Sequence, residues 1–228
     1  MSFYLHIPET EQPLQLDAAI FDMDGLLVDS EGLATEAWRI ILARYNIPLR
    51  QKDIDDMFGM RIIEDARLFI AQYAIPQTPE DLVSERRVVM EDLLRQSLKP
   101  MPGAVTLVQT LSEHGVPLAL ATSGAQSHAE LCLQLTGLSA YFSLRVTGDV
   151  VERGKPAPDI FFMAANLLCI APEKCLVFED APHGAAAGVA AGSPVVCVPC
   201  EHTAKLQFPP VTLTARSLLD ALAMITFA

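Results

Sequence analysis

The sequence predicts an α/β protein built on a doubly wound parallel sheet, with an all-α domain inserted into it. Two observations support this class. Short apolar runs recur along the chain, and each ends at a polar turn. This pattern is typical of strands that helices cover on both faces. Segments of helical character separate these runs, as βαβ units require.

The predicted core strands are four apolar runs, at residues 18–21, 116–121, 176–178 and 194–198. A weaker strand is expected at residues 144–147. Helices are expected at residues 126–135, 159–168, 184–192 and 217–225. Pro158 suits a first helical turn, and Asp159 favours the positive end of a helix dipole, so a helix should begin there.

The inserted domain lies between the first and second strands. About ninety residues separate Asp24 from Val116, far more than a crossover needs. Residues 31–99 have helical periodicity, and the turn-rich segments 25–30 and 99–103 could serve as two hinges. The predicted organisation is a Rossmann-like catalytic core at residues 1–30 and 100–228, with a helical cap at residues 31–99. The first 16 residues show no informative pattern.

Composition excludes several kinds of partner. The 228 residues are 51% hydrophobic and have a net charge of −12, with no run of Lys or Arg. A globular protein of this charge repels nucleic acid and anionic membranes, so we expect neither as a partner. The sequence indicates no obligate protein partner. Acidic residues near the N-terminus, an odd number of cysteines and no apolar run of ~18 residues predict a cytoplasmic protein.

Acidic residues follow two of the predicted strands. Asp22 and Asp24 end the first strand, and side chains two residues apart share one face. Glu179 and Asp180 end another strand, and ligands of open parallel sheets bind at the carboxyl ends of strands. Neighbouring carboxylates repel one another, so a cation is expected between them. Hard oxygen ligands predict Mg²⁺.

Such a site suits phosphoryl transfer. Asp22 could attack phosphorus and form an aspartyl phosphate, while Asp24 protonates the leaving oxygen and later deprotonates the attacking water. Lys155 and Mg²⁺ would offset the repulsion between the carboxylate and the phosphoryl group. A hydroxyl and unhindered N–H groups suited to phosphate come from Thr122, Ser123 and Gly124.

Four ordered segments resemble the motifs of the haloacid dehalogenase-like hydrolase superfamily. They are Asp22-Met23-Asp24-Gly25, Thr122-Ser123, Gly154 to Phe161, and Val177-Phe178-Glu179-Asp180-Ala181. The resemblance covers residues 18–198. The helical insertion resembles the cap of the subgroup that contains β-phosphoglucomutase and sugar-phosphate phosphatases. This implies a Mg²⁺-dependent phosphatase of a small phosphorylated metabolite, with a sugar phosphate as the expected substrate.

The resemblance also assigns roles to single residues. It makes Asp22 the nucleophile and a metal ligand, and Asp24 the acid/base whose backbone carbonyl binds Mg²⁺. Thr122 becomes the phosphate-binding hydroxyl, Lys155 the charge-neutralising lysine and Asp180 a metal ligand, with Glu179 as a ligand or a neighbour of the ligands. In the cap, Gly59-Met60-Arg61 resembles a substrate loop, which makes Arg61 a candidate substrate contact. An exposed helix arginine is the alternative at that position.

Other interpretations remain open at this stage. A phosphomutase would use the same aspartyl phosphate, and a non-catalytic phosphometabolite binder could share the fold. Cys197 and Cys200 suggest a redox or zinc pair but lack a second pair, which favours buried structural thiols. His183 follows Asp180 closely, although a solvent-exposed helix start suits it better. The other histidines, His128 among them, show no ligand spacing.

Overall fold

The computed structural model describes residues 2–8, 10–57 and 62–228 and contains two compact units. One unit comprises Met1–Asp29 and Lys99–Ala228, and the other comprises Ser30–Leu98. Among the described residues, none of the helices combines the length and the apolar character that a membrane span requires.

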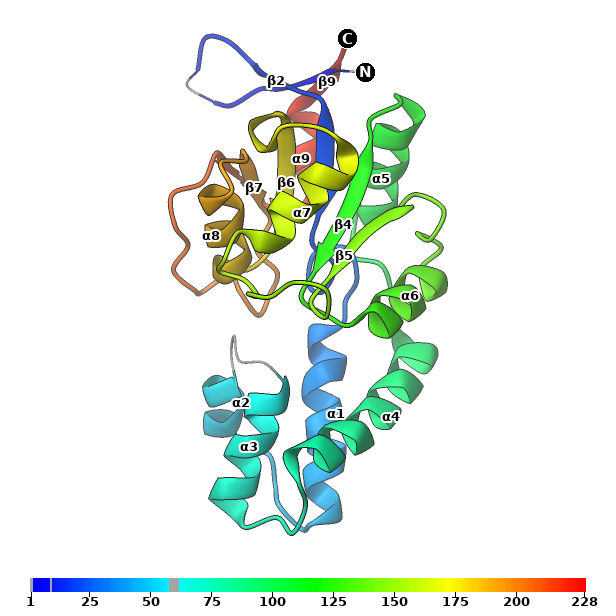
Figure 1. Cartoon of the computed structure of the whole chain (residues 1–228), viewed down its shortest axis with the longest axis vertical. Coiled ribbons are helices and arrows are strands. Elements are labelled where there is room, and N and C mark those ends of the chain that lie inside the picture. Colours follow the sequence, from blue (N-terminus) through cyan, green and yellow to red (C-terminus); the bar gives the residue numbers. More distant parts are fainter. Residues whose placement is uncertain (1, 9, 58–61) are drawn as a thin grey trace. The chain divides into compact units, whose positions relative to one another are not determined.

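The first unit is built on a six-stranded parallel sheet with the strand order β5-β4-β3-β6-β7-β8 (Figure 1). From β3 the chain adds β4 and β5 on one side and then returns to add β6, β7 and β8 on the other. This doubly wound order confirms the predicted fold class. The strands are β3 (Ala18–Phe21), β4 (Leu118–Thr122), β5 (Leu144–Thr147), β6 (Cys175–Glu179), β7 (Val195–Cys197) and β8 (Leu213–Thr214).

Helices cover both faces of this sheet, as the apolar runs require. Ile20, Ala121 and Val177 form one buried cluster with residues of α7 (Asp159–Leu168) and α8 (Pro182–Ala190). The ring of Phe21 stacks on that of Phe178 at a centroid distance of 4.7 Å. Figure 1 shows α7 in front of the sheet and α5 and α9 behind it. The remaining helical elements of this unit are α5 (Ala104–Glu113), α6 (Gln126–Leu135), α9 (Leu218–Ala223) and a 3-10 turn at Pro172–Lys174.

A second, small sheet joins the two ends of the chain. Its antiparallel order is β2-β1-β9, from β1 (Phe3–Leu5), β2 (Leu14–Leu16) and β9 (Ile225–Phe227). The structure therefore corrects two expectations. The N-terminal segment forms a hairpin, and the last helix ends at Ala223 rather than at residue 225, because Ile225 pairs with Leu5.

In the second unit, the regular elements among the described residues are all helices. They are α1 (Glu31–Arg44), α2 (Gln51–Met57), α3 (Ile62–Tyr73) and α4 (Pro79–Ser97). Trp38 lies in the core of this unit. The centroid of its ring is 5.0 Å from that of the Phe69 ring, and the Arg86 guanidinium carbon is 5.0 Å from the Trp38 ring centroid. Thr78 caps α4 because its hydroxyl accepts the N–H of Asp81 at 3.1 Å. This packing places Trp38 in the core of the helical unit.

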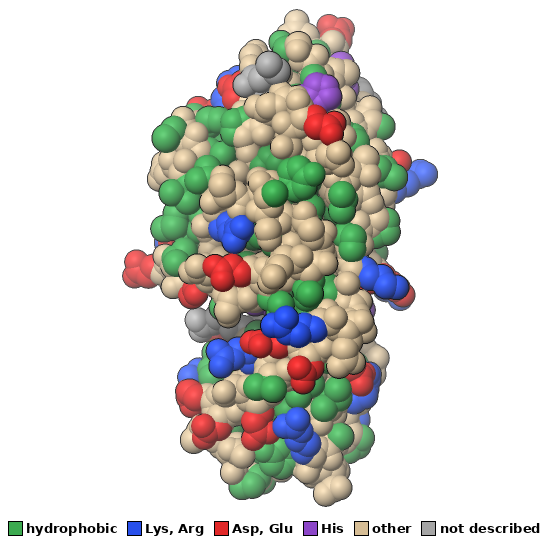
Figure 2. Space-filling view, turned by 90° about the vertical axis from the view of Figure 1, so that its right-hand side faces the viewer, with side chains coloured by type: hydrophobic (Ala, Val, Ile, Leu, Met, Phe, Trp, Pro, Cys, Tyr) green, Lys and Arg blue, Asp and Glu red, His purple; other side chains and the backbone are tan. Residues whose placement is uncertain are grey.

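A buried carboxylate ties α2 to α3. Asp53 accepts hydrogen bonds from the Arg50 N–H at 2.9 Å, the Tyr73 hydroxyl at 2.7 Å and the Gln72 amide at 3.0 Å. Burial opposes ionisation, but the Arg50 guanidinium, which also donates to Asp53, and these hydrogen bonds hold the pKa of Asp53 well below its ordinary value. On the face shown in Figure 2, positive and negative side chains are interspersed over the helical unit.

Candidate active site

The carboxyl ends of three neighbouring strands bring the candidate residues together. β3 leads into Asp22, β4 ends at Thr122, and β6 ends at Glu179. Because β3 lies between β4 and β6, these residues stand where the direction of strand addition reverses. Open α/β sheets bind ligands at this switch point.

Lys155 links the acids of β3 and β6. Its ammonium group is 2.5 Å from Asp22 Oδ1 and 2.6 Å from Glu179 Oε1, and it donates to the Ala121 carbonyl at 3.0 Å. The side chain is only 7% exposed. Burial would lower the pKa of Lys155, but the charges of Asp22 and Glu179 raise it above its ordinary value. Lys155 is therefore a buried cation at neutral pH.

The two acidic partners of this lysine belong to a cluster of three buried carboxylates. Carboxylate oxygens of Asp22, Glu179 and Asp180 lie within 4.8 Å of one another. Burial, and then the charge of Glu179 and Asp22, raises the pKa of Asp180. Burial also raises the pKa of Asp22, against the opposing effect of Lys155. Ionisation of all three acids beside one lysine is therefore opposed, and a further cation would favour it by offsetting their repulsion.

Glu179 has partners on both of its oxygens. Oε1 accepts from Lys155, and Oε2 accepts the backbone N–H groups of Asp180 at 3.0 Å and Ala181 at 3.1 Å. Its two neighbours in the cluster, Asp22 and Asp180, have hard oxygen donors that suit a divalent cation such as Mg²⁺. The residues present therefore fit a magnesium site, in which Glu179 orients the lysine and the turn after β6.

The turn after Asp24 depends on a glycine. Gly25 has a φ of +79°, and a Cβ there would collide with the Asp180 carboxylate. The same turn pairs with the returning chain, because the Asp29 N–H donates to the Lys99 carbonyl at 3.0 Å. The two predicted hinge segments thus lie side by side within the first unit.

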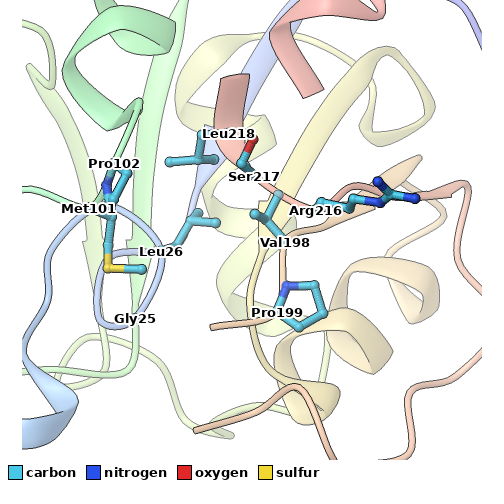
Figure 3. Close-up of a pocket in the computed structure, with 9 residues that line it drawn as sticks. All are labelled: Gly25, Leu26, Met101, Pro102, Val198, Pro199, Arg216, Ser217 and Leu218. Carbon is cyan, nitrogen blue, oxygen red and sulfur yellow. The ribbon is translucent and has the colours of Figure 1, made fainter. Parts of the chain in front are cut away.

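A small cavity lies next to this turn, with a volume of about 120 Å³ (Figure 3). Leu26, Met101 and Val198 provide much of its apolar wall, and Arg216 lies at its side. None of the candidate catalytic carboxylates lines it. It is therefore a neighbour of the site and holds none of its reactive groups.

Asp24 has partners on both side-chain oxygens. The Thr122 hydroxyl donates to Oδ2 at 3.4 Å and accepts the Gly124 N–H at 3.0 Å. His128 Nε2, from the first turn of α6, is 2.9 Å from Oδ1. The Asp24 carboxylate raises the pKa of His128 to about 11. Sequence spacing missed this histidine, since the contact joins residues far apart in the chain.

Of the remaining candidates, Cys200 lies beside Asp180. Ser123 is exposed in the loop before α6. Arg61, with Gly59 and Met60, lies outside the described residues. His183 is exposed on α8. Cys197 and Cys200 are buried and have free thiols.

Comparisons with known proteins agree with this geometry. Residues 16–192 match the family described as haloacid dehalogenase-like hydrolase. A probable pseudouridine-5'-phosphatase of Drosophila melanogaster is 36% identical over 207 residues, which cover 88% of this chain and 89% of that protein. A mitochondrial (DL)-glycerol-3-phosphatase 1 of Arabidopsis thaliana is 39% identical over 211 residues, or 88% of this chain and 70% of that protein.

A solved structure extends the likeness to the fold. The crystal structure of a putative beta-phosphoglucomutase from Thermotoga maritima has a TM-score of 0.77 and 27% sequence identity. The match covers 92% of this chain and 98% of that one. Both the curated relatives and this structure therefore match nearly the whole of the described chain.

Proposed function

The chain belongs to the haloacid dehalogenase-like hydrolase family, and on this premise we propose that it is a Mg²⁺-dependent phosphatase of small phosphomonoesters, with sugar phosphates as the expected class. The observation behind this proposal is the buried group of Asp22, Lys155, Glu179 and Asp180 at the ends of β3 and β6. The two relatives named above are described as phosphatases, which supports the reaction class.

In this proposal Asp22 is the nucleophile. Its Oδ1 already contacts the Lys155 ammonium, which lowers the repulsion between the carboxylate and an incoming phosphoryl group. The P–O bond to the leaving alcohol breaks as the bond from Asp22 to phosphorus forms. Water then cleaves the aspartyl phosphate, which releases orthophosphate and restores the carboxylate.

Asp24 transfers the proton in both half-reactions. It donates a proton to the leaving oxygen in the first half and takes one from the attacking water in the second. Thr122 contributes its hydroxyl to the phosphate side of the site, next to the N–H of Gly124. Ser123 and, from the helical unit, Arg61 are proposed as further substrate contacts.

The side chains of Asp22 and Asp180, with the backbone carbonyl of Asp24, would hold Mg²⁺. When bound, the ion supplies positive charge against phosphoryl oxygens. Lys155 and the ion together would balance the cluster of three carboxylates described above.

A phosphate-release screen tests the proposal. Wild-type protein with Mg²⁺ should release orthophosphate from one or more sugar, polyol or nucleotide monoesters. Asp22→Asn should abolish release and leave the far-ultraviolet circular dichroism unchanged. The matched control is Asp17→Asn, at the opposite end of β3, where Asp17 accepts a hydrogen bond from Ser2. Undiminished release by Asp22→Asn would refute the nucleophile assignment.

A phosphomutase is the second candidate, favoured by the likeness to the putative beta-phosphoglucomutase. Both activities share the aspartyl phosphate, but a mutase returns the phosphoryl group to another hydroxyl. Measuring orthophosphate and isomerised product from one hexose phosphate separates them. A non-catalytic binder would give neither product from any ester in the screen.

A further inference from the structure

The imidazole of His128, on α6, contacts the carboxylate of Asp24 directly. His128 Nε2 lies 2.9 Å from Asp24 Oδ1, while the Thr122 hydroxyl lies 3.4 Å from Oδ2. The His128 and Asp24 side chains are 24% and 27% exposed. One carboxylate oxygen is thus held by the imidazole, and the other is directed to the phosphate-binding loop.

The backbone leaves space for this contact. Gly124 lies in the loop before α6, and a Cβ there would lie 2.9 Å from His128 Cδ2 and 3.7 Å from Asp24 Oδ2. Any side chain at position 124 would therefore press on the imidazole. The absence of a side chain lets the ring approach the carboxylate.

Cys132 packs against the same ring from the next turn of α6. Its Sγ is 3.7 Å from Nε2 and 4.0 Å from Nδ1 of His128. Asp, His and Cys are donors of the kind that zinc sites use. However, a sulfur at nearly equal distances from both ring nitrogens lies on the lone-pair axis of neither. This placement indicates packing that fixes the ring, with Nε2 directed at Asp24.

We infer that His128 is a positioning residue for Asp24, an inference that rests on the proposed phosphatase function. Without the imidazole, water would replace it as the hydrogen-bond partner of Oδ1, and the partly exposed carboxylate would occupy more than one rotamer. Proton transfer needs a narrow range of donor–acceptor geometry, so the loss of a fixed rotamer slows it. His128 itself exchanges no proton with substrate in this scheme.

The inference predicts a dependence on the leaving group. The kcat/KM of this reaction reports events only as far as departure of the leaving group. An alkoxide needs protonation by Asp24 far more than p-nitrophenolate does. His128→Ala should therefore lower kcat/KM by about 10- to 100-fold for an alkyl phosphate, and by only a few-fold for p-nitrophenyl phosphate. The KM for either ester should stay nearly constant.

Two further variants make the result specific. His128→Gln places an amide N–H within reach of Asp24 and should recover much of the rate with the alkyl ester. His183→Ala, at the exposed start of α8, is the matched histidine control and should leave both rates unchanged. Equal losses with the two esters would indicate a merely structural role and overturn the inference. A faster His128→Ala enzyme would also overturn it, because the contact would then hold Asp24 away from substrate.

The contact can also be tested without turnover. Asp24→Asn should shift the ¹⁵N resonance of the His128 ring in substrate-free protein, whereas Asp17→Asn should not. An unshifted resonance would overturn the inference even in an active phosphatase. Phosphate release by the wild type is a separate result, and its absence would count against the proposed function.

Discussion

Replacing Lys155 with methionine removes the cation of the acidic cluster and keeps most of the side-chain volume. Methionine can still pack beside the Phe161 ring, which lies 5.0 Å from the ammonium. It cannot donate to Asp22, Glu179 or the Ala121 carbonyl. The substitution therefore isolates the electrostatic contribution of Lys155 from its packing.

The expected cost follows from burial. Both ion pairs have side chains at most 10% exposed, so solvent cannot replace the lost partner. Removing one member of a buried pair costs about 3–5 kcal/mol, because the other charge is left uncompensated. In the variant the pKa of Asp22, already raised by burial, rises further above its unfolded-state value. The wild-type pKa of Asp22 is itself raised to about 8, so the destabilisation grows as the pH rises through that value, and it is smaller at pH 6 than at pH 9.

Urea unfolding with EDTA present, followed by circular dichroism, measures this cost. Lys205→Met, at an exposed loop position, is the matched control and should change stability by less than about 0.5 kcal/mol. Phosphate release by Lys155→Met should fall by about 10²- to 10³-fold or more. A loss of stability below about 1 kcal/mol, equal at both pH values, would refute a buried ion-pair role for Lys155.

Three further outcomes are expected. Gly25→Ala should cost about 1–2 kcal/mol of stability, because a φ of +79° is unfavourable for alanine. The new Cβ should also displace Asp180 and so raise the Mg²⁺ concentration that gives half-maximal phosphate release. An unchanged stability together with an unchanged Mg²⁺ concentration would contradict this role of the turn. Asp53→Asn should lose about 1.5–3 kcal/mol at neutral pH in thermal or urea unfolding, because Asp53 accepts charge-assisted bonds from Arg50 and Tyr73. Because the folded-state pKa of Asp53 is depressed, this difference should shrink progressively as the pH falls below about 4 and be lost only below that depressed pKa; a constant difference would argue against the carboxylate. EDTA should abolish phosphate release and added Mg²⁺ should restore it, whereas full activity in chelator would exclude a metal requirement.

The core strands could be predicted because burial on both faces leaves a local signature. Every residue of β3, β4 and β6 is buried, so each reads as an apolar run. The small sheet left no such signature. β1 is three residues long, and its partner β9 lies at the other end of the chain. Ile225 therefore looked like the end of an amphipathic helix, and only pairing with Leu5 makes it a strand residue.

The acidic residues were predictable for a related reason. Parallel strands end at one edge of the sheet, so polar residues directly after apolar runs are brought together whatever the details of packing. His128 follows no strand. Its contact with Asp24 depends on the phase of α6 and on how closely that helix approaches β3, which are tertiary properties that no spacing rule reports.

Two glycines, Gly25 and Gly124, have a structural role that their sequence motifs do not reveal. Next to a polar motif, a glycine is normally interpreted as a turn residue, and the φ of Gly25 agrees with that. At both Gly25 and Gly124, however, the space of the missing Cβ is taken by a functional side chain of a different element: the Asp180 carboxylate in one case and the His128 imidazole in the other. A glycine next to a polar motif at a strand end can therefore mark a close approach as well as a turn. In this chain Gly25 marks the approach of Asp180, which the sequence placed at the end of a strand. Gly124 marks the approach of His128, for which the sequence pattern predicted no role.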